Sequence, residues 1–274
     1  MLGATKTSTQ AGIFIFTKIS AKRENNTKTR KKKENPTSEE VRKLNEIYAI
    51  KDLNIKLHHN FAPGDMHLVL TYKGIEPSLA EAKKKMSNFK RDLAKLYKKH
   101  SKTVKWIEAT EYKHKRIHHH MIINAFDARL IQEIWQHGYV RPSYLDDTND
   151  WRALASYIIK ETRKTFAEDG AYGKRRFRCS RTIKNPVSYV EDVSLAQIIL
   201  PKPAKGYYIE KESVYDGKMP GTNKPYVDYI QIALEGATKL RRGKKREYQK
   251  EKYLKWEDEQ LAFDSECFCD ERKG

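Results

Sequence analysis

Three consecutive histidines, His118, His119 and His120, are the residues of this 274-residue sequence with the clearest potential for metal chemistry. Successive side chains of a β-strand point to opposite faces, so His118 and His120 would share one face while His119 joins apolar neighbours on the other. Two imidazoles on one face can bind a single divalent metal ion. The triplet therefore predicts one half of a metal site.

A carboxylate on a neighbouring strand can complete such a site. Residues 104–111 and 117–124 are predicted to form two strands joined by a short turn. If the turn is symmetric, Glu111 lies opposite His118 and shares its face. If the loop has an odd number of residues, Glu108 becomes the candidate instead. We favour Glu111 as the third ligand.

Tyr157 lies on a predicted helix, residues 150–164, beside the apolar stripe that would face the core. Lys160 follows one turn later and shares the side of Tyr157, as does Glu161. A phenol has a pKa of about 10, so it needs a nearby cation or a metal-polarised substrate before it can attack phosphorus. We predict that Tyr157 is a nucleophile and that Lys160 lowers its pKa or steadies the phosphate.

The composition indicates a polyanionic partner. The chain carries 55 Lys and Arg residues against 36 Asp and Glu residues, a net charge of +19. Nucleic acid is favoured over a membrane, because no apolar run approaches the length of a bilayer span and no cleavable leader is recognisable. Three cysteines without a disulfide-like pattern predict an intracellular protein.

A basic segment follows the predicted tyrosine helix. Cations with an interleaved aromatic suit a single strand of DNA, through phosphate neutralisation and base stacking. The residues predicted to contact DNA are Arg175, Arg176, Phe177, Arg178 and Arg181.

The elements that must position these residues alternate between antiparallel strands and helices, which predicts an α+β fold with a central antiparallel sheet and flanking helices. Ser78 with Glu81 forms a capping box at the start of one of these helices. We expect a flexible basic arm over residues 1–37, a catalytic domain over 38–200, a C-terminal extension packing on or near it over 201–235, and a charged tail over 236–274.

Three motifs, taken in order along the chain, resemble those of the HUH endonucleases, specifically the rolling-circle replication initiator (Rep) proteins of bacterial plasmids, phages and integrated elements. Residues 67–72 are similar to the first Rep motif, 116–123 to the histidine–hydrophobic–histidine motif, and 156–161 to the Tyr-x-x-Lys nucleophile motif. The likeness covers roughly residues 37–190. The sequence departs from the common pattern in carrying His119 between the two ligands.

The resemblance implies a sheet with an RRM-like palm, the histidines on its open face and the tyrosine helix beside it. It implies Mg²⁺ or Mn²⁺ as cofactor, attack by Tyr157 on single-stranded or hairpin origin DNA, and a 5′-phosphotyrosine that a later 3′-hydroxyl resolves without ATP. The implied partners are origin DNA, a host helicase and a DNA polymerase in the bacterial cytoplasm, with no membrane.

Two other interpretations stay open from the sequence. An HUH relaxase or a single-tyrosine transposase would share the histidines, although relaxases usually place the nucleophile near the N-terminus. A basic nucleic-acid-binding protein without catalysis would share the charge, with its histidines purely structural. Convergence of Glu111, His118, His120 and Tyr157 in space would favour an enzyme.

Overall fold

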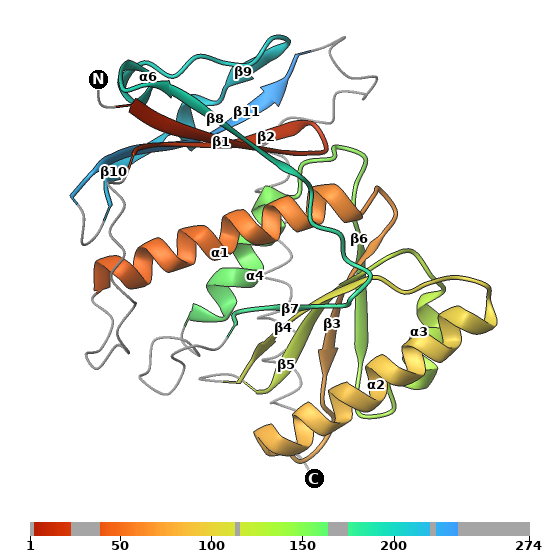
Figure 1. Ribbon diagram of the computed structural model, residues 1–274. Coiled ribbons are helices and arrows are strands. Elements are labelled where there is room, and N and C mark those ends of the chain that lie inside the picture. The colour runs from red at the N-terminus through yellow and green to blue at the C-terminus, as the bar shows by residue number, and fades with distance from the viewer. Residues whose placement is uncertain (1–2, 23–38, 113–115, 164–174, 220–222, 235–274) are drawn as a thin grey trace.

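The structure, a computed structural model, describes residues 3–22, 39–112, 116–163, 175–219 and 223–234. Its elements form two antiparallel sheets with helices between and beside them, so the predicted α+β class is confirmed (Figure 1). One sheet has five strands in the order β6-β3-β5-β4-β7. The other has six, in the order β10-β11-β2-β1-β8, with β9 also paired to β11.

The five-stranded sheet and its helices come from the middle of the chain. Its strands are β3 (Met66–Thr71), β4 (Trp106–Glu111), β5 (His118–Ile123), β6 (Val140–Tyr144) and β7 (Arg178–Cys179). The helices are α1 (Glu39–Asn60), α2 (Leu79–Lys99), α3 (Ala128–Ile134) and α4 (Arg152–Glu161).

The six-stranded sheet combines both ends of the described chain. Its strands are β1 (Gly3–Ala11), β2 (Phe14–Ala21), β8 (Ser188–Ser194), β9 (Tyr207–Ile209), β10 (Tyr215–Lys218) and β11 (Pro225–Ala233). Two short helical segments accompany it, α6 (Ala196–Ile199) and the 3₁₀ turn η2 (Lys211–Ser213).

Both faces of the five-stranded sheet are covered by helices, which explains why all six residues of β5 are buried. On one face Met121 and Ile123 pack against α2 and α3 in a core that includes Trp135. On the other face Ile122 packs against α1 and α4. The α2 helix begins at the predicted capping box, in which the Ser78 hydroxyl accepts a hydrogen bond from the Glu81 backbone N–H. Alternating side chains of β5 therefore enter two separate environments.

The expected flexible arm is wrong for residues 3–21, which form the β1–β2 hairpin at the centre of the six-stranded sheet. Gly12, with φ of +57°, supplies the left-handed backbone of the tight turn. The polar composition of β1 concealed the strand, and the other partners of the hairpin, β8 and β11, are supplied by segments far along the chain. Residues 23–37 of the expected arm lie outside the described residues.

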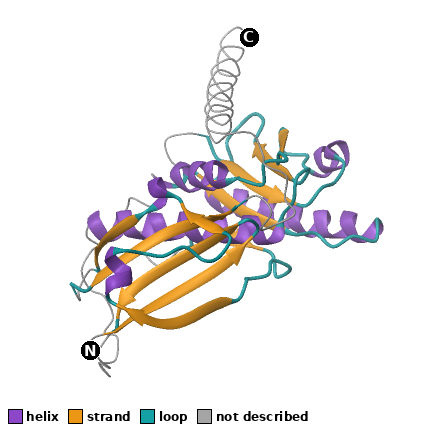
Figure 2. Ribbon diagram, turned by 90° about the horizontal axis from the view of Figure 1, so that it is seen from above, coloured by secondary structure: helices purple, strands orange, loops and turns teal. Residues whose placement is uncertain are grey.

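Helix α1 lies between the two sheets. Its Leu53 and Leu57 face the five-stranded sheet, while Ile55 packs against Phe14 and Phe16 of the six-stranded one. Seen from above, the strands of the six-stranded sheet lie across this layer of helices (Figure 2). A single helix with two apolar faces thus joins the sheets.

The C-terminal segments depart in part from the expected domain limits. Strand β8 falls inside the expected catalytic range 38–200 but pairs with β1 of the other sheet. Strands β9 to β11 occupy the expected extension 201–235, and β11 pairs with β2. The expected tail over 236–274 lies outside the described residues.

Candidate active site

The β4–β5 pairing sets the histidine face as the symmetric turn predicts. Glu111 lies opposite His118, and Ala109 lies opposite His120. The His118 and His120 rings are 5.0 Å apart at an angle of 78°. The turn itself, at residues 113–115, lies outside the described residues, but the register on either side of it decides between the two glutamates.

Glu111 is buried beside His118. Its Oε2 lies 3.4 Å from His118 Nε2. The other ring nitrogen, Nδ1, is 2.9 Å from the backbone oxygen of Arg116. A carbonyl can only accept, so Nδ1 carries the proton and Nε2 keeps its lone pair. His118 therefore presents a ligand atom toward the carboxylate.

Glu108, the alternative ligand, is on the opposite face of β4. Its carboxylate pairs with Lys90 of α2 and lies 4.0 Å from His119 Nδ1. His119 is itself bound by the Tyr72 hydroxyl at 2.9 Å and the Thr110 hydroxyl at 2.8 Å. Burial lowers the pKa of His119 to about 3, so this histidine is a neutral core residue rather than a ligand.

Helix α4 brings a further carboxylate to the histidine face. Ligand atoms of His118, His120 and Glu161 all lie within 4.8 Å of one another, a grouping that could hold a metal ion. Imidazole nitrogens with a carboxylate oxygen are donors that divalent cations accept. The sequence placed Glu161 on the side of Tyr157 but gave it no role; the signal was the four-residue step from Tyr157.

Tyr157 is buried next to His120, and the two rings meet edge to face with centroids 5.3 Å apart. Its neighbours on α4, Leu154 and Ile158, pack into the core between α1 and the sheet. Lys160 is exposed at the end of the same helix. The structure thus brings Glu111, His118, His120 and Tyr157 to one face of the sheet.

The N-terminal end of α4 is fixed by buried ion pairs to the six-stranded sheet. The Arg152 guanidinium pairs with Asp150 at 2.5 Å and also with Glu210. It stacks over the ring of Phe14 at 4.5 Å. These contacts, which sequence spacing did not reveal, hold the tyrosine helix to residues from both ends of the chain.

His58 of α1 supports the same helix start. Its Nδ1 donates to the Asn54 backbone oxygen, and its Nε2 accepts the backbone N–H of Trp151 at 3.1 Å. Burial lowers the pKa of His58 to about 4, which keeps Nε2 free of a proton and able to accept.

The predicted DNA-contacting segment divides into exposed and buried parts. Arg175, Arg178 and Arg181 are exposed. Phe177 is buried in the core of α1 and α4, so the expectation that it stacks on bases is not met in this arrangement. Arg176 is largely buried and pairs with Glu46 of α1 at 3.6 Å. Arg176 and Phe177 anchor the segment, because they are held by α1.

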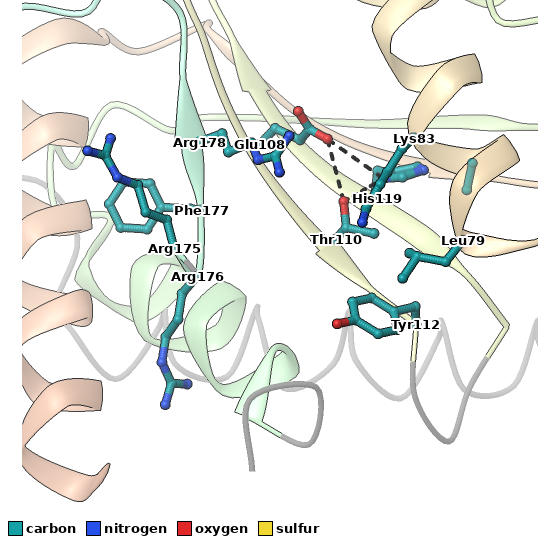
Figure 3. A pocket seen from close by; sticks show the side chains of 11 residues that line it. Leu79, Lys83, Glu108, Thr110, Tyr112, His119, Arg175, Arg176, Phe177 and Arg178 are labelled. Atoms are coloured by element: carbon teal, nitrogen blue, oxygen red, sulfur yellow. Dashed lines mark hydrogen bonds and ion pairs between the residues drawn. The ribbon is translucent and has the colours of Figure 1, made fainter. Parts of the chain in front are cut away.

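A shallow pocket lies where this segment passes α2 (Figure 3). Glu108, Thr110 and His119 contribute to its wall from the sheet, and Lys83 and Arg178 add cations from two other elements. These sheet residues belong to the face opposite the metal-binding histidines. The basic surface and the metal-binding group therefore lie on different sides of β4.

Comparison with known proteins supports the resemblance carried by the motifs. Residues 65–166 match a family model of replication-associated proteins of the ORF2 type. The match covers less than half of the chain, and it spans β3 to α4, which includes the histidine strand and Tyr157. It agrees with the predicted rolling-circle replication initiator, and such a family implies a DNA partner. No curated protein and no solved structure shows significant similarity.

None of the helices in the described ranges is long and apolar enough to cross a bilayer.

Proposed function

We propose that the protein is an HUH-type rolling-circle replication initiator that nicks and rejoins single-stranded or hairpin origin DNA. The observation that carries this proposal is the convergence of His118, His120 and Glu161 beside the ring of Tyr157. Origin DNA would be its substrate. A host helicase and DNA polymerase in the bacterial cytoplasm would extend the nicked strand.

His118 and His120 would hold the metal through Nε2, with Glu161 and Glu111 as the carboxylate ligands. The donor set fits Mg²⁺ or Mn²⁺, because both accept carboxylate oxygen and Mn²⁺ also accepts imidazole. When bound, the metal supplies Lewis-acid polarisation of the scissile phosphate. Glu111 lies 3.4 Å from His118 Nε2, so a small movement would bring its oxygen into the same coordination sphere.

Tyr157 would act as the nucleophile. Its phenol oxygen forms a bond to phosphorus as the bond to the 3′-oxygen breaks, so the products are a 5′-phosphotyrosine and a free 3′-hydroxyl. The phenol loses its proton and the departing 3′-oxygen gains one. Lys160, exposed one turn further along α4, would neutralise the phosphate.

The exposed arginines of the basic segment would contact the DNA backbone. Arg175 and Arg178 border the pocket of Figure 3 together with Lys83, and Arg181 is exposed further along the chain. Phosphate contacts of this kind position a strand without reading its sequence. Arg176 and Phe177 would act indirectly, by fixing the segment to α1.

Covalent capture tests the proposal. The full chain is incubated with Mn²⁺ and a panel of 3′-labelled single-stranded and hairpin oligonucleotides, and the label that stays with denatured protein is measured. We expect a covalent adduct that is absent in Tyr157→Phe and retained in Tyr189→Phe, whose exposed ring lies on β8. Binding of DNA across the panel without any adduct would contradict the proposal and favour a non-catalytic binding protein.

Glutamate variants test the ligand set. We expect Glu161→Gln and Glu111→Gln each to weaken Mn²⁺ binding by about 10-fold or more, because each removes a charged ligand. Glu108→Gln is the matched control, since its carboxylate faces α2. Equal loss of Mn²⁺ affinity in all three variants, measured by calorimetry, would argue against a site on the histidine face.

A further inference from the structure

A third histidine lies behind the metal-binding pair. His67 of β3 is buried on the same face of the sheet as His120 and lies diagonally across from it, since its direct partner on β5 is Ile122. His67 Nε2 is 3.2 Å from His120 Nδ1. The two rings are within 19° of parallel, with centroids 5.4 Å apart, an arrangement that permits a hydrogen bond between their edges.

The direction of this hydrogen bond follows from Ser143, the residue opposite His67 on β6. The Ser143 hydroxyl donates its one proton to the His67 backbone oxygen at 3.3 Å, so toward His67 Nδ1, 3.4 Å away, it acts as an acceptor. His67 then carries its proton on Nδ1 and keeps the lone pair of Nε2. That lone pair accepts the Nδ1–H of His120.

The same reasoning fixes the ligand atom of His120. With its proton on Nδ1, His120 has its lone pair on Nε2, the tautomer that His118 adopts by donating to the Arg116 backbone oxygen. Both histidines therefore offer Nε2, although one is fixed by a backbone carbonyl and the other by a side chain. Ligating histidines are generally oriented by such a bond to the second ring nitrogen.

We infer that His67 is a positioning residue that holds His120 in the orientation and tautomer in which Nε2 serves the metal. The inference rests on the proposed metal-dependent function. His67 is not a ligand itself, because its Nε2 is engaged by His120, and the potential metal-binding group found among the described residues comprises His118, His120 and Glu161. Two imidazoles buried side by side need this hydrogen bond, since an unsatisfied buried polar group is costly.

Two substitutions separate positioning from packing. His67→Phe keeps an aromatic ring but removes the acceptor, whereas His67→Gln loses the ring but places a carbonyl oxygen near the position of Nε2. Positioning predicts that Phe weakens Mn²⁺ binding by about 10- to 100-fold and that Gln restores most of it. Simple core filling predicts the reverse order. Mn²⁺ affinity of the full chain is measured by calorimetry, with melting temperatures to confirm folding.

The tautomer of His120 gives a readout that needs no metal. Nitrogen-15 chemical shifts of the metal-free protein should show His120 protonated on Nδ1 in the wild type and in His67→Gln, and a mixture of tautomers in His67→Phe. Unchanged Mn²⁺ affinity and an unchanged tautomer in His67→Phe would overturn the inference. A wild-type chain that binds no Mn²⁺ would overturn the proposed function, and the tautomer would still decide the role of His67.

Discussion

The two sheets differ in how far along the chain their strands are gathered. The five-stranded sheet uses residues 66–179 and carries the histidine face. The six-stranded sheet joins β1 and β2 to β8 and β11, and it contributes none of the proposed ligands. Its contribution is to hold α4 through Glu210 and Phe14. The chemistry is thus encoded in one continuous segment, while its support is assembled from distant parts.

Breaking the link between the sheets should have the largest effect on stability. Arg152→Met leaves the buried Asp150 and Glu210 carboxylates without their cation, and removal of one partner from a buried pair costs about 3–5 kcal/mol. We expect a loss of that size in the free energy of unfolding, measured by urea titration. Adding Glu210→Leu should recover part of it. A loss below about 1 kcal/mol would mean that the sheets are joined mainly by apolar contacts.

Acid should loosen the same junction through His58. The folded-state pKa of about 4 lies below the unfolded value of about 6.5, so the unfolded chain binds the extra proton between these values. His58 therefore causes no loss above about pH 6.5, and stability falls by about 1.4 kcal/mol per pH unit as the pH drops toward 4. We expect His58→Gln to reduce the slope by that amount in urea titrations across this range. An identical slope in both proteins would contradict this account.

The smallest effect is expected at the hairpin turn. A Cβ at Gly12 would lie 3.3 Å from the His58 backbone oxygen, and φ is +57°. We expect Gly12→Ala to lower the free energy of unfolding by about 1 kcal/mol or somewhat more. Gly64→Ala is the control, because Gly64 also has positive φ but has no neighbouring atom within 4 Å of the added carbon. Full stability in Gly12→Ala would favour a loosely attached hairpin.

Sequence reasoning succeeded where contacts are local or follow strand alternation. The capping box at Ser78 and the pairing of Glu111 with His118 depend on spacings of a few residues, and both are confirmed. The β1–β2 hairpin was missed because its strands are polar and two of its partners, β8 and β11, lie far away in sequence. His67 was interpreted as part of a structural strand, since its contact with His120 depends on the β3–β5 register, which no local pattern specifies.

The order of strands also has a consequence for folding during synthesis. The hairpin β1–β2 leaves the ribosome first, yet its neighbour β11 ends at Ala233. Glu210, which anchors α4, is also made after the histidines and Tyr157. Because domains fold as their residues emerge, the segment containing the site is complete before its support exists. The nascent chain would thus gain its ligands early and a firmly held tyrosine helix only near the end of translation.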